Sequence, residues 1–377
     1  MKYCKTCIQP NTRPNSYFGE DGICPACNYY HKVSMKADWD ERFEDLTNLL
    51  KSYRRKTAHG FDCIIGVSGG KDSTRQALWA RDKLGLKPLL VCMGYPPQQV
   101  TERGTDNISN LINLGFDVVF WTLSPETWRS IVREGFLRFT NWAKATEQAI
   151  ISSVPQLAIH YGIKLILWGE NPGLQLGDMK TVGRNGYDGN NLRFMNTVAG
   201  GGLEWLLEAG FERKKLIPYL YPSSEEFEKH NIQIVYLGWF WEDWSLINNG
   251  MYSCVNGLDI RNDTVENTGD LWGVTSLDED WVTLNQMIKY YKFGFGRVSD
   301  YANEEIRHGR MSRQAGIELA EKYDDACGAN YIESFCEYIG ISVDEFWIKV
   351  RSSVNRDLFT VNEDGKISPK FKVGVGL

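Results

Sequence analysis

Short apolar runs alternate with amphipathic segments through the middle of this 377-residue chain. Five of the runs are bounded by turn residues, and several are apolar on both faces, which is typical of parallel strands covered by helices. These expected strands span 62–67, 88–93, 117–123, 164–169 and 232–239. Three segments between them have helical periodicity: 73–84, 101–114 and 126–161, the last expected to be two helices divided before Pro155. Each segment is followed by a glycine that can end a helix, namely Gly85, Gly115 and Gly162.

This alternation predicts a doubly wound α/β domain of about five parallel strands over residues 58–245. Residues 36–57 have the pattern of a linker helix, and 1–35 form a separate cysteine-containing module. Residues 246–377 are mostly helical in pattern and are expected to bind substrate or a partner. The stretch 173–202 is rich in glycine and lacks periodicity, so we expect a long loop that covers a site.

The net charge of −6 argues against nucleic acid as a partner. Proteins that bind nucleic acids normally carry a basic surplus, which displaces counterions from phosphates. No apolar run approaches the roughly 20 residues that cross a bilayer, and the chain does not begin with a signal-peptide pattern. Nine cysteines, an odd number, cannot all pair in disulfides. We therefore expect a reduced, cytoplasmic protein with no membrane span.

Four of the cysteines form two CxxC pairs near the N-terminus. Sixteen residues, with the proline, asparagine and glycine of a hairpin, separate Cys4 and Cys7 from Cys24 and Cys27. Each CxxC turn can direct two thiolates at one tetrahedral ion, and four thiolates leave no coordination position open for catalysis. The spacing therefore predicts a structural Zn²⁺ in a zinc ribbon or knuckle. A redox dithiol is the other chemistry that such pairs support.

The first expected strand runs directly into Ser68-Gly69-Gly70-Lys71-Asp72-Ser73, where a helical pattern begins. Ligands of open α/β sheets bind beyond the carboxyl ends of strands, where helix N-termini add partial positive charge. Glycines let backbone N–H groups approach phosphate oxygens, the two serines donate from their hydroxyls, Lys71 supplies a charge, and Asp72 can bind Mg²⁺ or cap the helix. The spacing is neither that of Walker A nor that of a GxGxxG dinucleotide fold. The stretch therefore predicts a phosphate site of another kind.

The SGGKDS loop (residues 68–73) resembles the PP-loop of ATP pyrophosphatases, the superfamily of GMP, NAD and asparagine synthetases and of tRNA thiolases. The resemblance implies the HUP-like form of the doubly wound fold, cleavage of ATP between its α and β phosphates, and pyrophosphate held in the loop. It implies catalytic roles for Ser68, Lys71, Asp72 and Glu170; the last belongs to "WGEN" after the fourth strand and is a candidate contact to Mg²⁺ or substrate. The ATP-binding residues that it implies are Val67, Ser68, Gly69, Gly70, Lys71, Asp72, Ser73, Met93, Gly94 and Gly169.

The chain as a whole resembles the N-acetyl sugar amidotransferases of bacterial surface-polysaccharide (lipopolysaccharide O-antigen) and flagellin-sugar biosynthesis. The resemblance rests on "MKYCKTC", "GICPACNYY", "GVSGGKDS", "WGEN" and, most specifically, "KYYKFGFGRVSDYANEEIRHGRMSRQAG" at 289–316. It implies a nucleotide-activated acetamido sugar as substrate, such as a UDP-linked diacetamido uronic acid. ATP with Mg²⁺ would adenylate the acetamido oxygen, and ammonia would then replace that oxygen to leave an acetamidino group, with AMP and pyrophosphate released.

Ammonia is expected from a separate glutaminase, similar to that of imidazole glycerol phosphate synthase. This chain has neither an N-terminal cysteine nucleophile nor a GxCxG elbow of its own. Water must be excluded, because it would return the activated amide to the starting material, and the glycine-rich loop is the expected lid. The candidate contacts to substrate phosphates are Lys180, Arg184, Arg193, Lys292 and Arg297, although solvated loop charge also explains the first three. Asp300 is expected to cap a helix.

Two other functions stay open. A tRNA thiolase shares the cysteine pairs and the loop, but it needs a basic RNA-binding face and reactive cysteines near the ATP site. Cys63 and Cys92 lie in expected strands and are more typical of an inert core. A non-catalytic nucleotide-binding scaffold is disfavoured, because every chemically active side chain of the loop is present.

Overall fold

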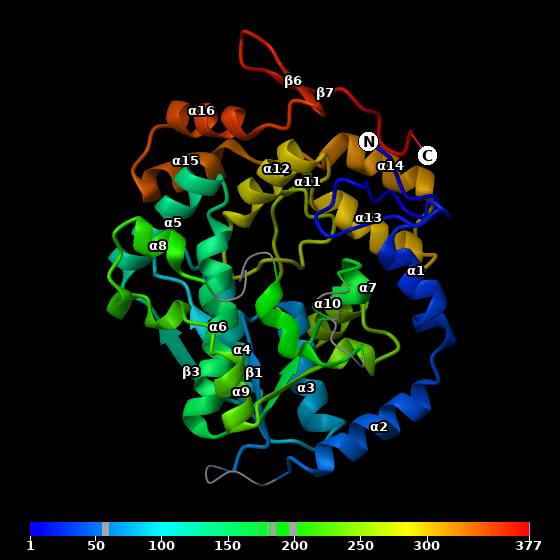
Figure 1. Cartoon of the computed structure of the whole chain (residues 1–377), viewed down its shortest axis with the longest axis vertical. Helices are drawn as coiled ribbons and strands as arrows, with labels where there is room; N and C mark the ends of the chain where they lie inside the picture. Colours follow the sequence, from blue (N-terminus) through cyan, green and yellow to red (C-terminus); the bar gives the residue numbers. More distant parts are fainter. Residues whose placement is uncertain (55–59, 171, 179–180, 182–185, 196–201, 377) are drawn as a thin grey trace.

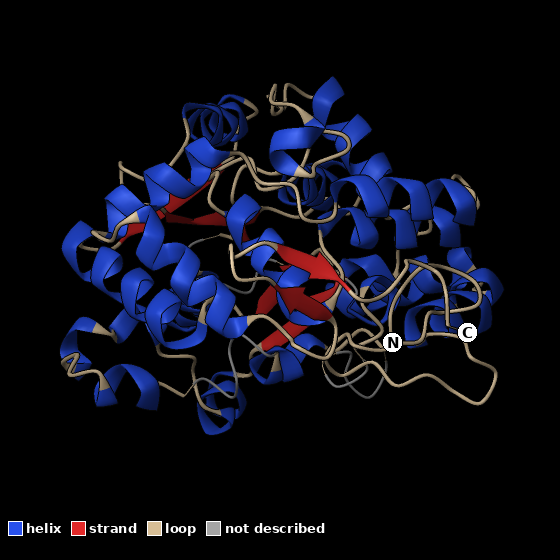
Figure 2. Cartoon of the chain, turned by 90° about the horizontal axis from the view of Figure 1, so that it is seen from above, coloured by secondary structure: helices blue, strands red, loops and turns tan. Residues whose placement is uncertain are grey.

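A five-stranded parallel β-sheet forms the centre of the molecule (Figure 1, Figure 2). The computed structural model describes residues 1–54, 60–170, 172–178, 181, 186–195 and 202–376. The strands are β1 Cys63–Gly66, β2 Pro88–Gly94, β3 Asp117–Thr122, β4 Leu165–Trp168 and β5 Gln233–Tyr236. They lie in the order β3-β2-β1-β4-β5, with every neighbouring pair parallel. The expected strands and the doubly wound α/β class are confirmed.

β1 occupies the middle of the sheet, between β2 and β4. Its residue Ile64 is in register with Leu89 of β2 and with Ile166 of β4. β2 and β3 therefore lie on one side of β1, and β4 and β5 lie on the other. The carboxyl ends of β1 and β4 border the crevice in which ligands of such sheets bind. The residues that follow these two strands are neighbours there.

Helices cover both faces of the sheet (Figure 2). Their bounds are α2 Trp39–Lys51, α3 Lys71–Asp82, α4 Glu102–Asn113, α6 Ala143–Tyr161 and α9 Ser224–His230. Cys63 and Ile65 belong to the apolar layer that includes α2, α3 and α4, whereas Ile64 belongs to the layer that includes α6 and α9. Because successive strand residues point to opposite faces, both sets of β1 positions must be apolar.

The helical segment 126–161 divides at Thr140, not before Pro155 as expected. α5 spans Pro125–Phe139, and Thr140 ends it with a left-handed φ of 47°. Pro155 lies inside α6. Proline removes one backbone hydrogen bond from a helix interior, but α6 is packed on the sheet along much of its length, and this packing outweighs the local cost.

From residue 282 onward the chain is mostly helical, as its pattern predicts. The elements are α12 Val282–Phe293, α13 Arg297–Arg307, α14 Arg313–Tyr323, α15 Ala329–Ile339, α16 Val343–Ser353 and the hairpin of β6 Phe359–Val361 with β7 Ile367–Pro369. Phe136 of α5 stacks on Phe346 and meets the edge of Phe335. α5 therefore shares one apolar core with α12, α15 and α16, whereas the apolar residues of α13 and α14 form a separate cluster.

The N-terminal residues lie against α13 and α14 (Figure 1). The backbone N–H of Ile8 donates to Asn303 Oδ1, and the guanidinium of Arg313 donates to the Cys7 carbonyl. α1 Pro25–Lys32 and a turn at Ser34–Lys36 then lead to α2. These contacts attach the N-terminal residues to helices of the C-terminal region. The expected domain boundaries near 35, 57 and 245 stay predictions.

Short helices and turns connect the remaining parts. They are α7 Pro172–Gln175, η2 Gly189–Phe194, α8 Glu204–Glu208, η4 Arg213–Lys215, η5 Ile217–Tyr219, η6 Leu237–Trp239, α10 Leu246–Val255 and α11 Val265–Thr268. Of these, α10 matters most for the site, because it packs directly on α3. None of the helices in the described ranges combines the length and the apolar composition that a membrane span requires.

Candidate active site

The SGGKDS loop forms the turn between β1 and α3. The N–H of Val67 bonds to the Val91 carbonyl at 2.8 Å, which continues the pairing of β1 with β2 up to the loop. Gly70 is the N-cap of α3 and provides no side-chain cap. The first N–H groups of α3 are therefore left for an anion, which the partial positive charge of the helix N-terminus also favours.

Gly69 lets the turn approach α4 closely. Its φ is 76°, in the left-handed region. A Cβ at this position would lie 2.9 Å from Cβ of Asn107 and 3.2 Å from the backbone nitrogen of Ile108. Only glycine fits, because the backbone of a packed helix cannot move aside at low cost.

We expect Gly69→Ala to lower the free energy of unfolding and to slow ATP cleavage. Left-handed strain alone costs about 1–2 kcal/mol, and the contact with α4 adds to it. Urea unfolding measures the first effect and AMP release the second. Gly162→Ala is the matched control, because its φ is 67° but a Cβ would meet nothing within 4 Å. Equal loss of AMP release in the two variants would contradict this role of Gly69.

Helix α10 holds the polar side chains at the start of α3. Lys71 Nζ lies 2.7 Å from Asp72 Oδ2, and Asn249 donates Nδ2 to Asp72 Oδ1 at 2.6 Å. Arg75 donates to Asn249 Oδ1 at 2.7 Å, which fixes the end of the amide that faces Asp72. Ser253 Oγ donates to the Lys71 carbonyl at 2.7 Å. Sequence reasoning missed Asn249 and Ser253, because an isolated asparagine or serine on a helix matches no motif.

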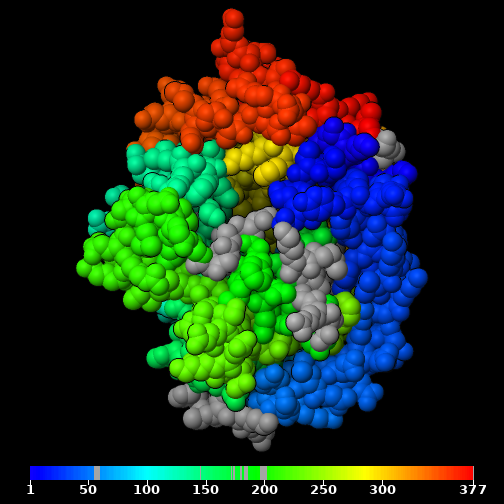
Figure 3. Space-filling view, viewed as in Figure 1, coloured from blue at the N-terminus to red at the C-terminus, as the bar shows by residue number. Residues whose placement is uncertain are grey.

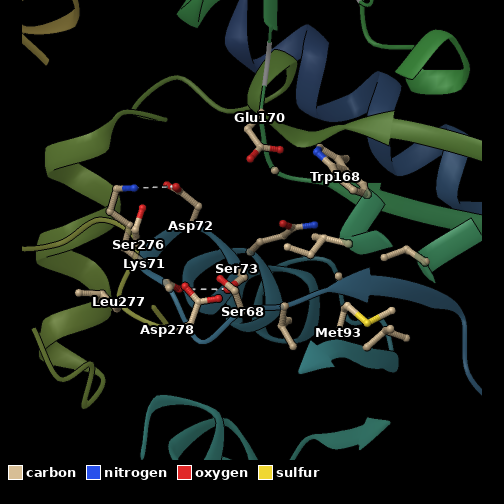
Figure 4. A pocket seen from close by; sticks show the side chains of 18 of the residues that line it. Ser68, Lys71, Asp72, Ser73, Met93, Trp168, Glu170, Ser276, Leu277 and Asp278 are labelled. Carbon is tan, nitrogen blue, oxygen red and sulfur yellow. Dashed lines mark hydrogen bonds and ion pairs between the residues drawn. The ribbon is translucent and has the colours of Figure 1, made fainter. Parts of the chain in front are cut away.

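The SGGKDS loop, the ends of β2 and β4, and residues 274–278 line one cavity of about 200 Å³, called here the loop cavity (Figure 4). The carboxylates of Asp72, Glu170 and Asp278 lie around the same space (Figure 4). The predicted residues that it brings together are Val67, Ser68, Gly70, Lys71, Asp72, Ser73, Met93, Gly169 and Glu170. Gly69 and Gly94 are not in this lining. Gly94 faces β3, where its Cβ would lie 2.8 Å from Thr122 Oγ1.

Glu170 follows β4 and reaches into the loop cavity. Gly169 precedes it and brings the chain against Trp244, since a Cβ there would lie 2.7 Å from that ring. The Glu170 side chain is accessible within the cavity but has protein around it. This loss of solvation raises the pKa of Glu170 to about 7, and the negative charge of Asp72 acts in the same direction. Such a carboxyl group gains most from a bound cation.

Residues 274–278 supply a third carboxylate that sequence reasoning missed. Arg103 Nε donates to the Leu277 carbonyl at 2.8 Å, and the Thr101 N–H bonds to the Asp278 carbonyl at 3.0 Å. Ser276 has a left-handed φ of 48°. Burial raises the pKa of Asp278 to about 6, against the effect of Arg103. The contact of residues 277 and 278 with residues 101 and 103 joins segments far apart in sequence, so no local pattern could indicate it.

The predicted substrate residues that the structure describes do not line the loop cavity. Arg193 lies over the rings of Tyr221 and Phe227. Arg297 is buried, with its nearest guanidinium nitrogen 4.0 Å from Asp270. Lys292 donates to two backbone carbonyls and lines a different cavity. Lys180 and Arg184, like Asn171 of "WGEN", fall outside the described residues. The substrate roles of these residues stay predictions.

Asp300 does not cap a helix. Gly296 is the N-cap of α13, and Asp300 lies in its first turn. Its carboxylate pairs with Arg13 and with Lys289. The prediction failed because the pattern of an acidic residue near a helix start cannot distinguish a cap from an ion pair inside the first turn.

The four N-terminal cysteines converge as their spacing predicts. The Sγ atoms of Cys4, Cys7, Cys24 and Cys27 all lie within 4.8 Å of one another, and all four residues are buried. Backbone N–H groups donate to these sulfurs; for example, the N–H of Cys24 lies 3.2 Å from Cys4 Sγ. The donor set therefore fits one tetrahedral Zn²⁺, and four thiolates would complete its coordination.

The cysteines near the sheet do not have the properties of reactive thiols. Cys63 and Cys92 are buried in the core. Loss of solvation raises the pKa of the Cys92 thiol to about 12 and raises that of Cys63 further. Among the described residues, no cysteine lines the loop cavity. This arrangement gives no support to a thiolase mechanism.

Residues 270–372 match the family model described as LPS biosynthesis protein WbpG-like, C-terminal domain. We call residues 270–372 the WbpG-like segment, after the family model to which they are similar. The WbpG-like segment includes 289–316, the most specific part of the resemblance to polysaccharide-biosynthesis amidotransferases, and supports that resemblance. It also includes Ser276, Leu277 and Asp278, so the matched region contributes directly to the loop cavity.

No curated protein matches the chain at a significant level. Among solved structures, NMN synthetase from Francisella tularensis is similar over 51% of this chain and 82% of its own, with 16% sequence identity and a TM-score of 0.28. So low a TM-score supports no conclusion about function.

Proposed function

We propose that the protein is an ATP-dependent, AMP-forming amidotransferase of bacterial surface-polysaccharide biosynthesis. Its substrate is a nucleotide-activated N-acetyl sugar, and its product carries an acetamidino group in place of the acetamido group. One observation carries the proposal: the SGGKDS loop and Asp278 of the WbpG-like segment line the same cavity. This shared lining supports a site built from both the SGGKDS loop and the WbpG-like segment.

The reaction requires activation of a weak electrophile. The acetamido oxygen attacks the α phosphorus of ATP, and the bond between that phosphorus and the bridging oxygen of pyrophosphate breaks. The backbone N–H groups of the loop, the Ser68 hydroxyl and the Lys71 ammonium stabilise the negative charge that develops on the leaving pyrophosphate. Ammonia then adds to the imidate carbon, the C–O bond breaks, and AMP leaves with the former acetamido oxygen while the nitrogen loses its extra protons.

The residues of the loop cavity are suited to binding Mg²⁺ together with ATP. Asp72, Glu170 and Asp278 offer carboxylate oxygens, the ligands that Mg²⁺ prefers in proteins. The raised pKa values of Glu170 and Asp278 are those of carboxylates without a full counter-charge. When bound, Mg²⁺ would neutralise charge on the phosphates. Ammonia is proposed to come from a separate glutaminase.

The products of ATP test the proposed function. We expect purified protein with ammonium, ATP, Mg²⁺ and a UDP-linked diacetamido sugar to release AMP and pyrophosphate. Mass spectrometry of the sugar is expected to show exchange of one oxygen for NH. Release of ADP, or AMP formation that depends on tRNA and not on the sugar, would contradict the proposal.

The pH dependence is expected to follow Glu170. As pH rises through the Glu170 pKa of about 7, the carboxyl group loses its proton and can bind a cation, so kcat/KM for ATP is expected to rise. Glu170→Gln should lower activity, and the remaining activity should no longer rise as pH passes through about 7. If the Glu170→Gln variant keeps the same rise of kcat/KM with pH, another group is responsible for the titration.

A further inference from the structure

A second cavity lies at the N-terminal end of α6, away from the SGGKDS loop. It measures about 410 Å³ and is lined by N-terminal residues, the turn between α5 and α6, and residues of α12. Figure 3 shows this face hollowed between the dark blue N-terminal residues and the teal α5, with yellow residues at its floor. We call it the cationic cavity, because four basic side chains line it: Arg13, Lys144, Lys289 and Lys292.

Of the residues that the structure describes, four basic and no acidic side chains line the cationic cavity, and the carboxylates that act on these lysines, Glu147, Asp300 and Asp324, lie outside the lining. Asp300 is shared by two of the cations, with Lys289 Nζ at 2.6 Å and Arg13 on its other oxygen. Lys292 donates to the carbonyls of Phe139 at 2.6 Å and Thr140 at 2.9 Å, so one of its three N–H donors is left over. Burial lowers the pKa of Lys292 to about 8. A desolvated ammonium of this kind is stabilised by an anion.

Polar atoms without partners also mark the cationic cavity. Arg13 Nε, Asn141 Oδ1 and Gln286 Oε1 are buried, and no described residue bonds to them. All three residues line the cationic cavity, so polar groups adjoin its charged side chains. Hydroxyl groups and phosphate oxygens of a ligand are suited to such surroundings.

The two cavities share one helix. Lys144 lines the cationic cavity and Ile150 lines the loop cavity, and both belong to α6. At about 1.5 Å of rise per residue, these positions are roughly 9 Å apart along the helix axis. A nucleotide-activated sugar separates its diphosphate from a ring substituent by a comparable length, so its size suits a site that extends along this part of α6.

We propose that the cationic cavity binds the nucleoside diphosphate of the acceptor, while its acetamido group reaches the loop cavity. This inference rests on the proposed function, and it assigns to Lys144 and Lys292 contacts to the diphosphate of the sugar nucleotide. ATP stays at the SGGKDS loop. The two phosphate-bearing substrates thus approach the reacting atoms from opposite ends of the N-terminal half of α6.

Calorimetry with UDP tests the cationic cavity. The titration is made with saturating Mg²⁺ and α,β-methylene ATP, which occupies the loop cavity and cannot be cleaved between its α and β phosphates. We expect UDP to bind, uridine to bind at least tenfold more weakly, and Lys292→Ala and Lys144→Ala each to weaken UDP by about tenfold or more, as loss of a charge-assisted hydrogen bond does. Lys322→Ala, an exposed lysine on α14, is the matched control and should bind UDP like the wild type.

Three results would contradict the binding of the nucleoside diphosphate in the cationic cavity. No binding of UDP to the wild type, equal binding of uridine and UDP, or unchanged UDP binding by both lysine variants would overturn the proposal. Thermal unfolding of each variant separates binding from folding; Lys144→Ala keeps the test valid if Lys292→Ala destabilises the end of α5. Failure of the proposed function has a different signature, because the wild type would then bind UDP but not form AMP.

Discussion

Replacing Asp72 by asparagine is expected to lower the rate of AMP release by about 100-fold or more. Asp72 is the carboxylate at the N-terminus of α3, held between Lys71 and Asn249, and asparagine keeps its size but removes its charge. The loss corresponds to removal of one group that stabilises the transition state electrostatically. Chromatography of the adenine nucleotides measures it.

Two further variants make the result specific. Asp82→Asn removes an exposed carboxylate at the other end of the same helix, and we expect its activity to equal that of the wild type. Asn249→Ala leaves Asp72 charged but without its amide partner, and a loss of roughly tenfold is expected, as for one hydrogen bond to a charged group. Normal AMP release by Asp72→Asn would remove the loop from the mechanism.

Cys24→Ser is expected to abolish the zinc binding that we predict for the cysteine cluster and to lower the free energy of unfolding by several kcal/mol, roughly. The cluster fixes the N-terminal residues that contact α13 and α14. Activity should also fall, because Gly177, in the segment after Glu170, packs closely against the helix that carries Cys27. A Cβ on Gly177 would lie 2.7 Å from the backbone nitrogen of Ala26. Metal analysis and chemical unfolding measure the two effects.

Cys254→Ser is the matched control for the zinc prediction. Cys254 is exposed on α10 and lies outside the cysteine cluster. We expect this variant to keep one zinc per chain and the stability of the wild type. Wild-type protein that is purified without chelators and contains no zinc would refute the assignment of the cluster, whatever the behaviour of the variants.

Local patterns predicted the sheet and the glycine turn between β1 and α3 because both depend on residues close together in sequence. Apolar strand residues on two faces fix the strands, and Gly69 marks a turn that only glycine allows. The convergence of the two CxxC pairs was predicted for the same reason. In each case, the physical requirement is met by neighbouring residues.

Long-range packing explains what the sequence could not reveal. Pro155 stays inside α6 because the helix is packed on the sheet, which no local propensity records. Asn249 and Asp278 reach the site through contacts with α3 and α4, far from them in the chain. Lys292 was predicted as a substrate contact from its motif, but only the fold shows that it lies in a second cavity.

The path of one oxygen atom tests the proposed reaction. In that reaction, the acetamido oxygen of the sugar attacks the α phosphorus of ATP and leaves with AMP. With acceptor labelled by ¹⁸O in its acetamido groups, we expect mass spectrometry to find the label in the phosphate of AMP and none in pyrophosphate. Unlabelled AMP, or label in pyrophosphate or inorganic phosphate, would contradict it.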